Sequence, residues 1–140
     1  MTSIRDSDFV LQGARDAGFK LTIVDKARAK EIRDRIQAAF GGRSRLGPLW
    51  ERMPDMFSVQ DQQAYRRLPE FFPRGPVYLF FDEDNDRTMF MAENSIELVA
   101  ILGESQAVVT YVSDIELRGL VSMNDHDYFC AAGKFDNITP

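Results

Sequence analysis

The chain has one histidine, His126, and histidine is the side chain whose ordinary pKa best suits proton transfer near neutral pH. It lies between Asp125 and Asp127, whose carboxylates favour the charged imidazolium. A nucleophilic serine would require a strained Gly-x-Ser-x-Gly turn, a motif absent from the sequence, and a zinc site would have to combine His126 with Cys130 without a recognised ligand spacing. We predict no catalytic residues and no metal ligands. A small enzyme or ligand-binding domain that uses His126 and nearby carboxylates is the alternative.

Four carboxylates between residues 82 and 93 have the spacing of a calcium-binding loop. Asp82, Asp84, Asp86 and Glu93 occupy positions 1, 3, 5 and 12 of such a loop. An EF-hand also requires glycine at position 6 and a helix on each side, whereas this segment has arginine there and follows a strand-like run. We therefore predict a solvated hairpin turn, in which Asp and Asn accept the backbone conformation that a turn needs. No cofactor is expected.

Basic residues gather in one predicted helix, residues 25–40, and suggest a contact with phosphate or nucleic acid. Acidic residues are interspersed, and Lys30–Asp34 and Glu31–Arg35 have the i,i+4 spacing of ion pairs. The helix therefore neutralises much of its own charge and is expected to form a solvated outer face. Because the aromatic residues typical of single-strand binders are missing, we predict no nucleic-acid partner. The basic cluster comprises Lys26, Arg28, Lys30, Arg33 and Arg35, with Arg43 and Arg45 beyond.

The length and composition describe one domain over residues 1–140. The chain is 44% apolar and 28% charged, which is typical of a soluble domain with its own core. No apolar run approaches the roughly 18 residues of a membrane-spanning helix, and the first residues lack the apolar stretch of a secretory signal. One cysteine, Cys130, cannot form an internal disulfide and suits a core position. We expect a cytoplasmic protein without a membrane partner.

Helical periodicity and capping residues predict the helices. Residues 7–17 and 25–40 repeat apolar positions at i+3 and i+4, and Asp25 is a candidate N-cap for the second. Asn94 and Glu97 form a capping box that opens a short helix ending before Gly103. Residues 41–76 hold five of the six prolines and predict an irregular connector with short helical pieces, one of them within 60–68.

Apolar runs and alternating patterns predict strands at 19–24, 77–81, 88–91, 107–112, 117–123 and 128–132. The second and third are expected to form a hairpin around the acidic turn 82–86. Together these elements predict an α+β fold, with N-terminal helices packed on a mostly antiparallel sheet of about five to six strands. Trp50, Met53, Met56 and Phe57 form either core or a docking patch, and the sequence does not distinguish the two.

Charge is distributed unevenly along the chain. Residues 1–75 hold 14 Lys and Arg against 10 Asp and Glu, whereas residues 76–140 hold 3 against 12. Such an acidic half repels nucleic acid and speeds association with a basic partner. The predicted partner-binding residues are the acidic residues of the predicted turns, namely Asp82, Glu83, Asp84, Asp86, Asp114, Glu116, Asp125 and Asp127.

Five segments of the second half carry a resemblance to a known family. They are Phe80-Phe-Asp-Glu, Glu97-Leu-Val-Ala-Ile-Leu-Gly-Glu, Val109-Thr-Tyr-Val-Ser-Asp, Leu120-Val-Ser-Met-Asn-Asp-His-Asp and Ala132-Gly. Over residues 76–133 this succession resembles small bacterial toxin-immunity domains, broadly of the SMI1/KNR4-like type. The resemblance implies an α+β domain that binds and blocks a cognate protein toxin and has no catalytic residues. Its acidic turns would then cover the basic active-site cleft of a toxin, for instance one acting on nucleotides or nucleic acid.

Overall fold

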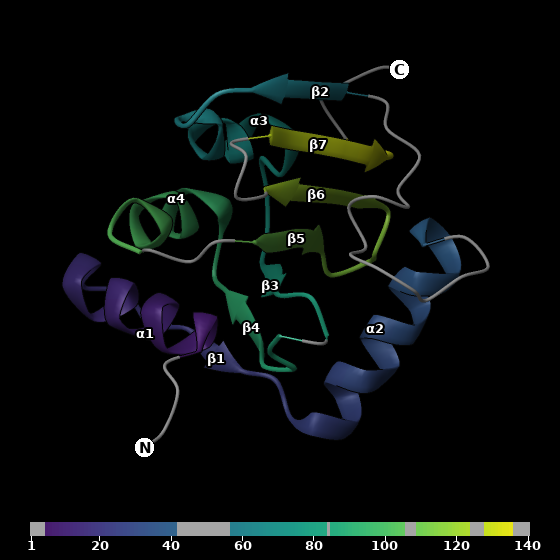
Figure 1. Ribbon diagram of the computed structural model, residues 1–140, viewed down its shortest axis with the longest axis horizontal. Coiled ribbons are helices and arrows are strands. Elements are labelled where there is room, and N and C mark those ends of the chain that lie inside the picture. Colours follow the sequence, from purple (N-terminus) through teal and green to yellow (C-terminus); the bar gives the residue numbers. More distant parts are fainter. Residues whose placement is uncertain (1–4, 42–56, 84, 106–108, 124–127, 136–140) are drawn as a thin grey trace.

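The computed structural model describes residues 5–41, 57–83, 85–105, 109–123 and 128–135, and within them the chain forms one antiparallel sheet (Figure 1). The sheet has seven strands in the order β1-β4-β3-β5-β6-β7-β2. This confirms the predicted α+β class. The strands are β1 (Thr22–Ile23), β2 (Phe57–Gln60), β3 (Val77–Phe80), β4 (Met89–Ala92), β5 (Thr110–Asp114), β6 (Gly119–Met123) and β7 (Tyr128–Gly133).

Two of the helices begin where the capping residues Asp25 and Asn94 predict. The Asp25 carboxylate accepts the backbone N–H of Arg28 at 3.0 Å, and Asn94 Oδ1 accepts that of Glu97 at 2.8 Å. These bonds satisfy N–H groups that have no partner within the first turn of a helix. The helical elements are α1 (Asp6–Ala17), α2 (Lys26–Phe40), the 3-10 turn η2 (Ala64–Arg67), α3 (Leu68–Phe71) and α4 (Ser95–Gly103).

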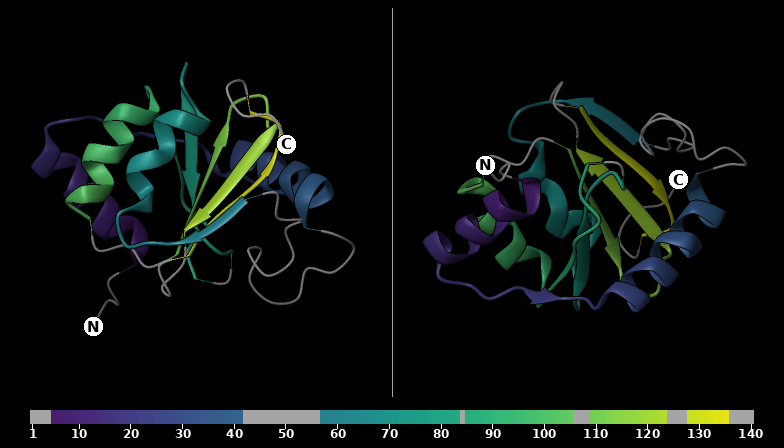
Figure 2. Two further views of the ribbon diagram at one scale, coloured as in Figure 1. Left: turned by 90° about the horizontal axis from the view of Figure 1, so that it is seen from above. Right: turned by 60° about the horizontal axis from the view of Figure 1, so that its bottom comes forward.

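Helices cover both faces of the sheet (Figure 2). Strand β3 is buried throughout: Val77 and Leu79 belong to the core shared with α1, α3 and α4, whereas Tyr78 and Phe80 belong to the core shared with α2. Because side chains alternate along a strand, one continuous apolar run serves both cores. The two-sided burial explains why residues 77–81 show no polar alternation.

Strand β2 brings the sheet to seven strands, where five to six were predicted. It lies in the proline-rich segment expected to be irregular, and it pairs with β7, a segment about 70 residues further along the chain, as in the pair Ser58 and Cys130. The ring of Phe57 lies 5.5 Å from that of Phe71 and 6.3 Å from that of Phe129, so Phe57 contacts the core. Other members of the predicted 50–57 patch, Trp50, Met53 and Met56, lie outside the described residues.

Candidate partner-binding surface

The predicted partner-binding carboxylates lie at two opposite ends of the sheet. Val77, which begins β3, pairs with Asp114, which ends β5, whereas Asp82 follows the far end of β3. Five residues of extended chain span about 16 Å. Two further strands meet this end of the sheet: Met123, the last residue of β6, and Tyr128, the first residue of β7, both lie at the Asp82 end. The remaining predicted residues Asp84, Asp125 and Asp127, like His126, fall outside the described part of the chain.

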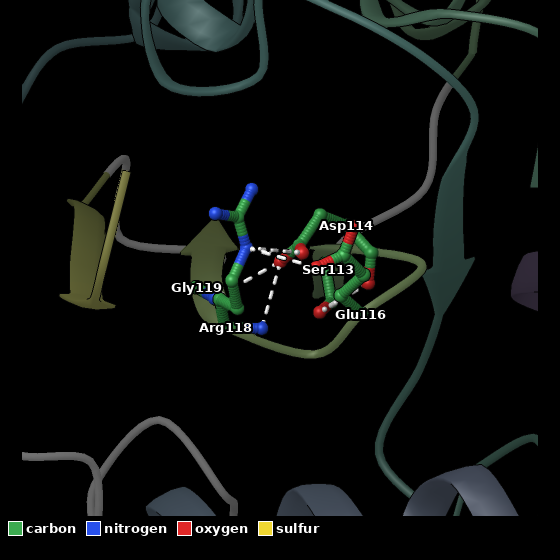
Figure 3. A network of polar contacts seen from close by, with 5 residues as sticks. All are labelled: Ser113, Asp114, Glu116, Arg118 and Gly119. Carbon is green, nitrogen blue, oxygen red and sulfur yellow. Dashed lines mark hydrogen bonds and ion pairs between the residues drawn. The ribbon is translucent and has the colours of Figure 1, made fainter. Parts of the chain in front are cut away.

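The Asp114 side chain organises the turn between β5 and β6 (Figure 3). Its Oδ1 accepts the backbone N–H groups of Arg118 at 3.0 Å and Gly119 at 2.9 Å, and its Oδ2 lies 3.4 Å from Arg118 Nε. Leu117 has a φ of 59° and donates its N–H to the Asp114 carbonyl. Left-handed backbone is unfavourable for leucine, and the surrounding hydrogen bonds offset that cost. The Asp114 contacts therefore hold the turn in one conformation.

Two exposed side chains follow Asp114 on this turn. Ile115 is 43% exposed, and the Glu116 side chain is 72% exposed. Glu116 Oε2 lies 3.6 Å from Arg118 Nε, an exposed ion pair of the kind that contributes about 0–1 kcal/mol. Glu116 can therefore exchange this contact for a partner's cation at little cost. A pre-ordered turn with an apolar and an acidic side chain loses little conformational entropy when it binds.

The β3–β4 turn uses two of its predicted carboxylates within the protein. Asp82 accepts the hydroxyl hydrogen of Tyr111 at 2.6 Å. Asp86 is only 4% exposed and accepts the backbone N–H groups of Ser7 and Thr88, each at 3.0 Å. Burial by itself raises the pKa of Asp86, but the hydrogen bonds from Ser7 and Thr88 outweigh it and lower the pKa. Asp86 thus ties the start of α1 to the β3–β4 turn, and its burial removes it from the set of residues that a partner can touch.

Arg33 is buried, contrary to the predicted solvated face of the basic helix. Its Nη1 donates to the Phe81 carbonyl at 2.9 Å and its Nη2 to the Asp86 carbonyl at 3.2 Å, and its guanidinium carbon lies 5.5 Å from the centre of the Phe80 ring. Burial lowers the pKa of Arg33, yet a guanidinium remains charged in proteins. Arg33 follows Ala29 by four residues, so its spacing within the apolar stripe was the signal for its burial.

The rest of that helix is largely as predicted. Lys30 pairs with Asp34 at 2.9 Å on the exposed side, as expected. Glu31, however, pairs with Arg28 at 3.1 Å, where the i,i+4 spacing had suggested Arg35. In each pair the two side chains lie about one helical turn apart, so the pairs partly neutralise the charge on the outer face of the helix.

Cys130 occupies a buried position, as predicted, with its Sγ 3.5 Å from Ser58 Oγ. Among the described residues, no three His, Cys, Asp or Glu side chains come together where they could hold a metal ion. In the same part of the chain, no helix is both long enough and apolar enough to span a bilayer.

Comparison of the chain with known protein families, curated proteins and solved structures finds no match. The fold defines the class: an α+β domain whose single antiparallel sheet carries helices on both faces. The resemblance to toxin-immunity domains remains a prediction, and the function has to be argued from the residues of this chain.

Proposed function

We propose that this protein binds and neutralises a cognate bacterial toxin, as an immunity protein without catalytic residues of its own. The observation that carries the proposal is the β5–β6 turn, in which Asp114 fixes the backbone while Ile115 and Glu116 remain exposed. Partner-binding residues cluster where a rigid apolar contact lies beside a charge that sets orientation.

The acidic second half of the chain supports a basic partner. Its 12 acidic and 3 basic residues create a negative field that attracts cations and increases the rate of encounter. Enzymes that act on nucleotides or nucleic acids carry basic clefts because their substrates are anionic. Our proposal therefore places the β5–β6 turn in the basic active-site cleft of such a toxin, in the cytoplasm where those substrates lie.

Charge reversal at the two ends of the sheet tests which end contacts the partner. The partner is the protein that copurifies with the chain from its native host. Glu116→Lys is expected to weaken the affinity about tenfold or more, because it replaces attraction by repulsion at the contact. Glu83→Lys is the matched control: Glu83 is also exposed but lies at the opposite end, and its reversal should change the affinity by less than about twofold.

Both variants should melt like the parent protein, since exposed turn charges change stability by only about 0.5 kcal/mol. Association of the parent should slow as the salt concentration rises, because salt screens charge attraction. If Glu116→Lys binds like the parent, or if Glu83→Lys weakens binding equally, the contact does not lie on the β5–β6 turn.

A further inference from the structure

A cavity of about 670 Å³ lies between the first half of α2, strand β1 and the β3–β4 turn. It is at the end of the sheet opposite Glu116, since Glu83 and residues 85–88 form one of its walls. Its charged lining is cationic although the chain as a whole carries a net charge of −5. Among the described residues of the lining, the acidic side chains are Glu83 and Asp86, and the basic ones are Arg5, Lys26, Lys30, Arg33 and Arg87.

Only some of the basic side chains of the cavity are balanced by the protein itself: Lys30 pairs with Asp34 at 2.9 Å, and Arg5 lies 4.0 Å from Asp8. The Asp86 carboxylate is occupied by two backbone N–H groups. Lys26 and Arg87 are exposed, and no ion pair joins either of them to another residue that the structure describes. The cavity therefore retains positive charge that an anion could neutralise.

Arg33 adds a buried cation to the wall of this cavity. It is 9% exposed and lines the cavity, and its Nε has no hydrogen-bond partner in the structure. Buried N–H groups are almost always paired, so the unpaired Nε–H leaves the guanidinium incompletely satisfied by the protein. Burial lowers the pKa of Arg33, the charges of Glu83 and Asp86 raise it, and the charge of Arg87 lowers it. An anion held beside Arg33 and Arg87 would relieve the repulsion between them.

We propose that this cavity binds a phosphorylated small molecule of nucleotide size. Guanidinium groups match the oxygens of a phosphate in geometry and charge, and Arg33, Arg87 and Lys26 would hold the phosphate. Ile23, which is 60% exposed, lies with Val24 and Ala29 on the same cavity and gives an apolar wall for the base and sugar. The volume falls within the range of about 300–1,000 Å³ found for small-molecule sites. The site does not depend on the proposed toxin-binding turn.

Calorimetric titration of the purified chain with inorganic phosphate, AMP, ADP and ATP at low salt tests the site. We expect saturable binding, tighter for the nucleotides than for phosphate because only they reach the apolar wall. Adenosine, which has no phosphate, should show no binding. Arg87→Gln and Lys26→Gln should each weaken nucleotide binding about tenfold or more, since each removes a charge-assisted contact.

Two further variants separate a site from general charge attraction. Arg35→Gln removes an exposed cation of the same helix that does not line the cavity, and it should leave the affinity within about twofold of the parent. Glu83→Gln removes a carboxylate from the lining and should tighten binding. The proposal is overturned if no ligand binds saturably at millimolar concentration, if adenosine binds as well as AMP, or if Arg35→Gln weakens binding as much as Arg87→Gln.

Discussion

Replacing Asp86 by alanine is expected to lower the free energy of unfolding by about 2–4 kcal/mol. The carboxylate is 4% exposed and is the acceptor for the backbone N–H groups of Ser7 and Thr88. Its loss leaves two donors without their partner and removes a negative charge near the buried Arg33. Thermal unfolding should show a melting temperature lower by roughly 5–15 °C.

The neighbouring Glu83→Ala is the control for Asp86→Ala. Glu83 is exposed, so its truncation should change stability by at most about 0.5 kcal/mol. Equal effects of the two substitutions would contradict a structural role for Asp86. The same comparison separates a buried carboxylate that holds the fold from an exposed one.

The effect of Asp86→Ala should also depend on pH. The folded-state pKa of Asp86 lies below its ordinary value, so its carboxylate stabilises the protein above about pH 4 and loses this contribution as it protonates at lower pH. The difference in unfolding free energy between the parent and Asp86→Ala should therefore decrease below about pH 4. Asp6, whose pKa is raised by burial and by the charges of Asp86 and Asp82, titrates with the opposite sign. Asp6→Asn, introduced into both the parent and the Asp86→Ala variant, removes the contribution of Asp6. If the difference in unfolding free energy between these two proteins then stays constant with pH, the lowered pKa does not belong to Asp86.

A methyl group at residue 133 should be equally damaging. Gly133 has a φ of +101°, which side chains rarely adopt, and a Cβ there would overlap the carbonyl oxygen of Arg118 and lie 2.9 Å from Phe40 Cε1. That carbonyl cannot move freely, because it accepts the N–H of Lys134 at 2.9 Å. Gly133→Ala is expected to cost at least about 3 kcal/mol of unfolding free energy, measured by chemical denaturation.

Gly75→Ala provides the matched comparison for Gly133→Ala. Gly75 also has a positive φ, +76°, but a Cβ there would meet nothing within 4 Å. Only the backbone conformation is then unfavourable, at a cost of about 1–2 kcal/mol. If the two substitutions cost the same, the close approach of β6 and β7 at Gly133 does not constrain the fold.

Features decided by neighbouring residues could be predicted from the sequence. The caps at Asp25 and Asn94 are hydrogen bonds to groups three residues away, and both are present. The apolar run 77–81 predicted a strand, and β3 is buried throughout. Strand β2 could not be predicted, because Phe57 and Val59 give too short a pattern and their partner strand is distant in sequence.

The candidate sites depended on tertiary structure that local patterns do not contain. Asp82, Glu83 and Asp86 look alike in the sequence, yet Tyr111 binds the first, the second is exposed, and the third is buried. Strand register alone places Asp114 at the other end of the sheet from Asp82. Arg33 had the spacing of a core residue, but the carbonyl groups that accept its hydrogen bonds come from a turn about 50 residues later.

Growth of a bacterial host tests the proposed function most directly. The protein encoded beside the gene of this chain is expressed from an inducible promoter, alone or together with the chain. We predict that the neighbouring protein alone arrests growth and that coexpression of the parent chain restores it. A neighbouring protein that leaves growth unchanged, or an arrest that persists despite abundant folded chain, would contradict the proposal that this protein neutralises a cognate toxin.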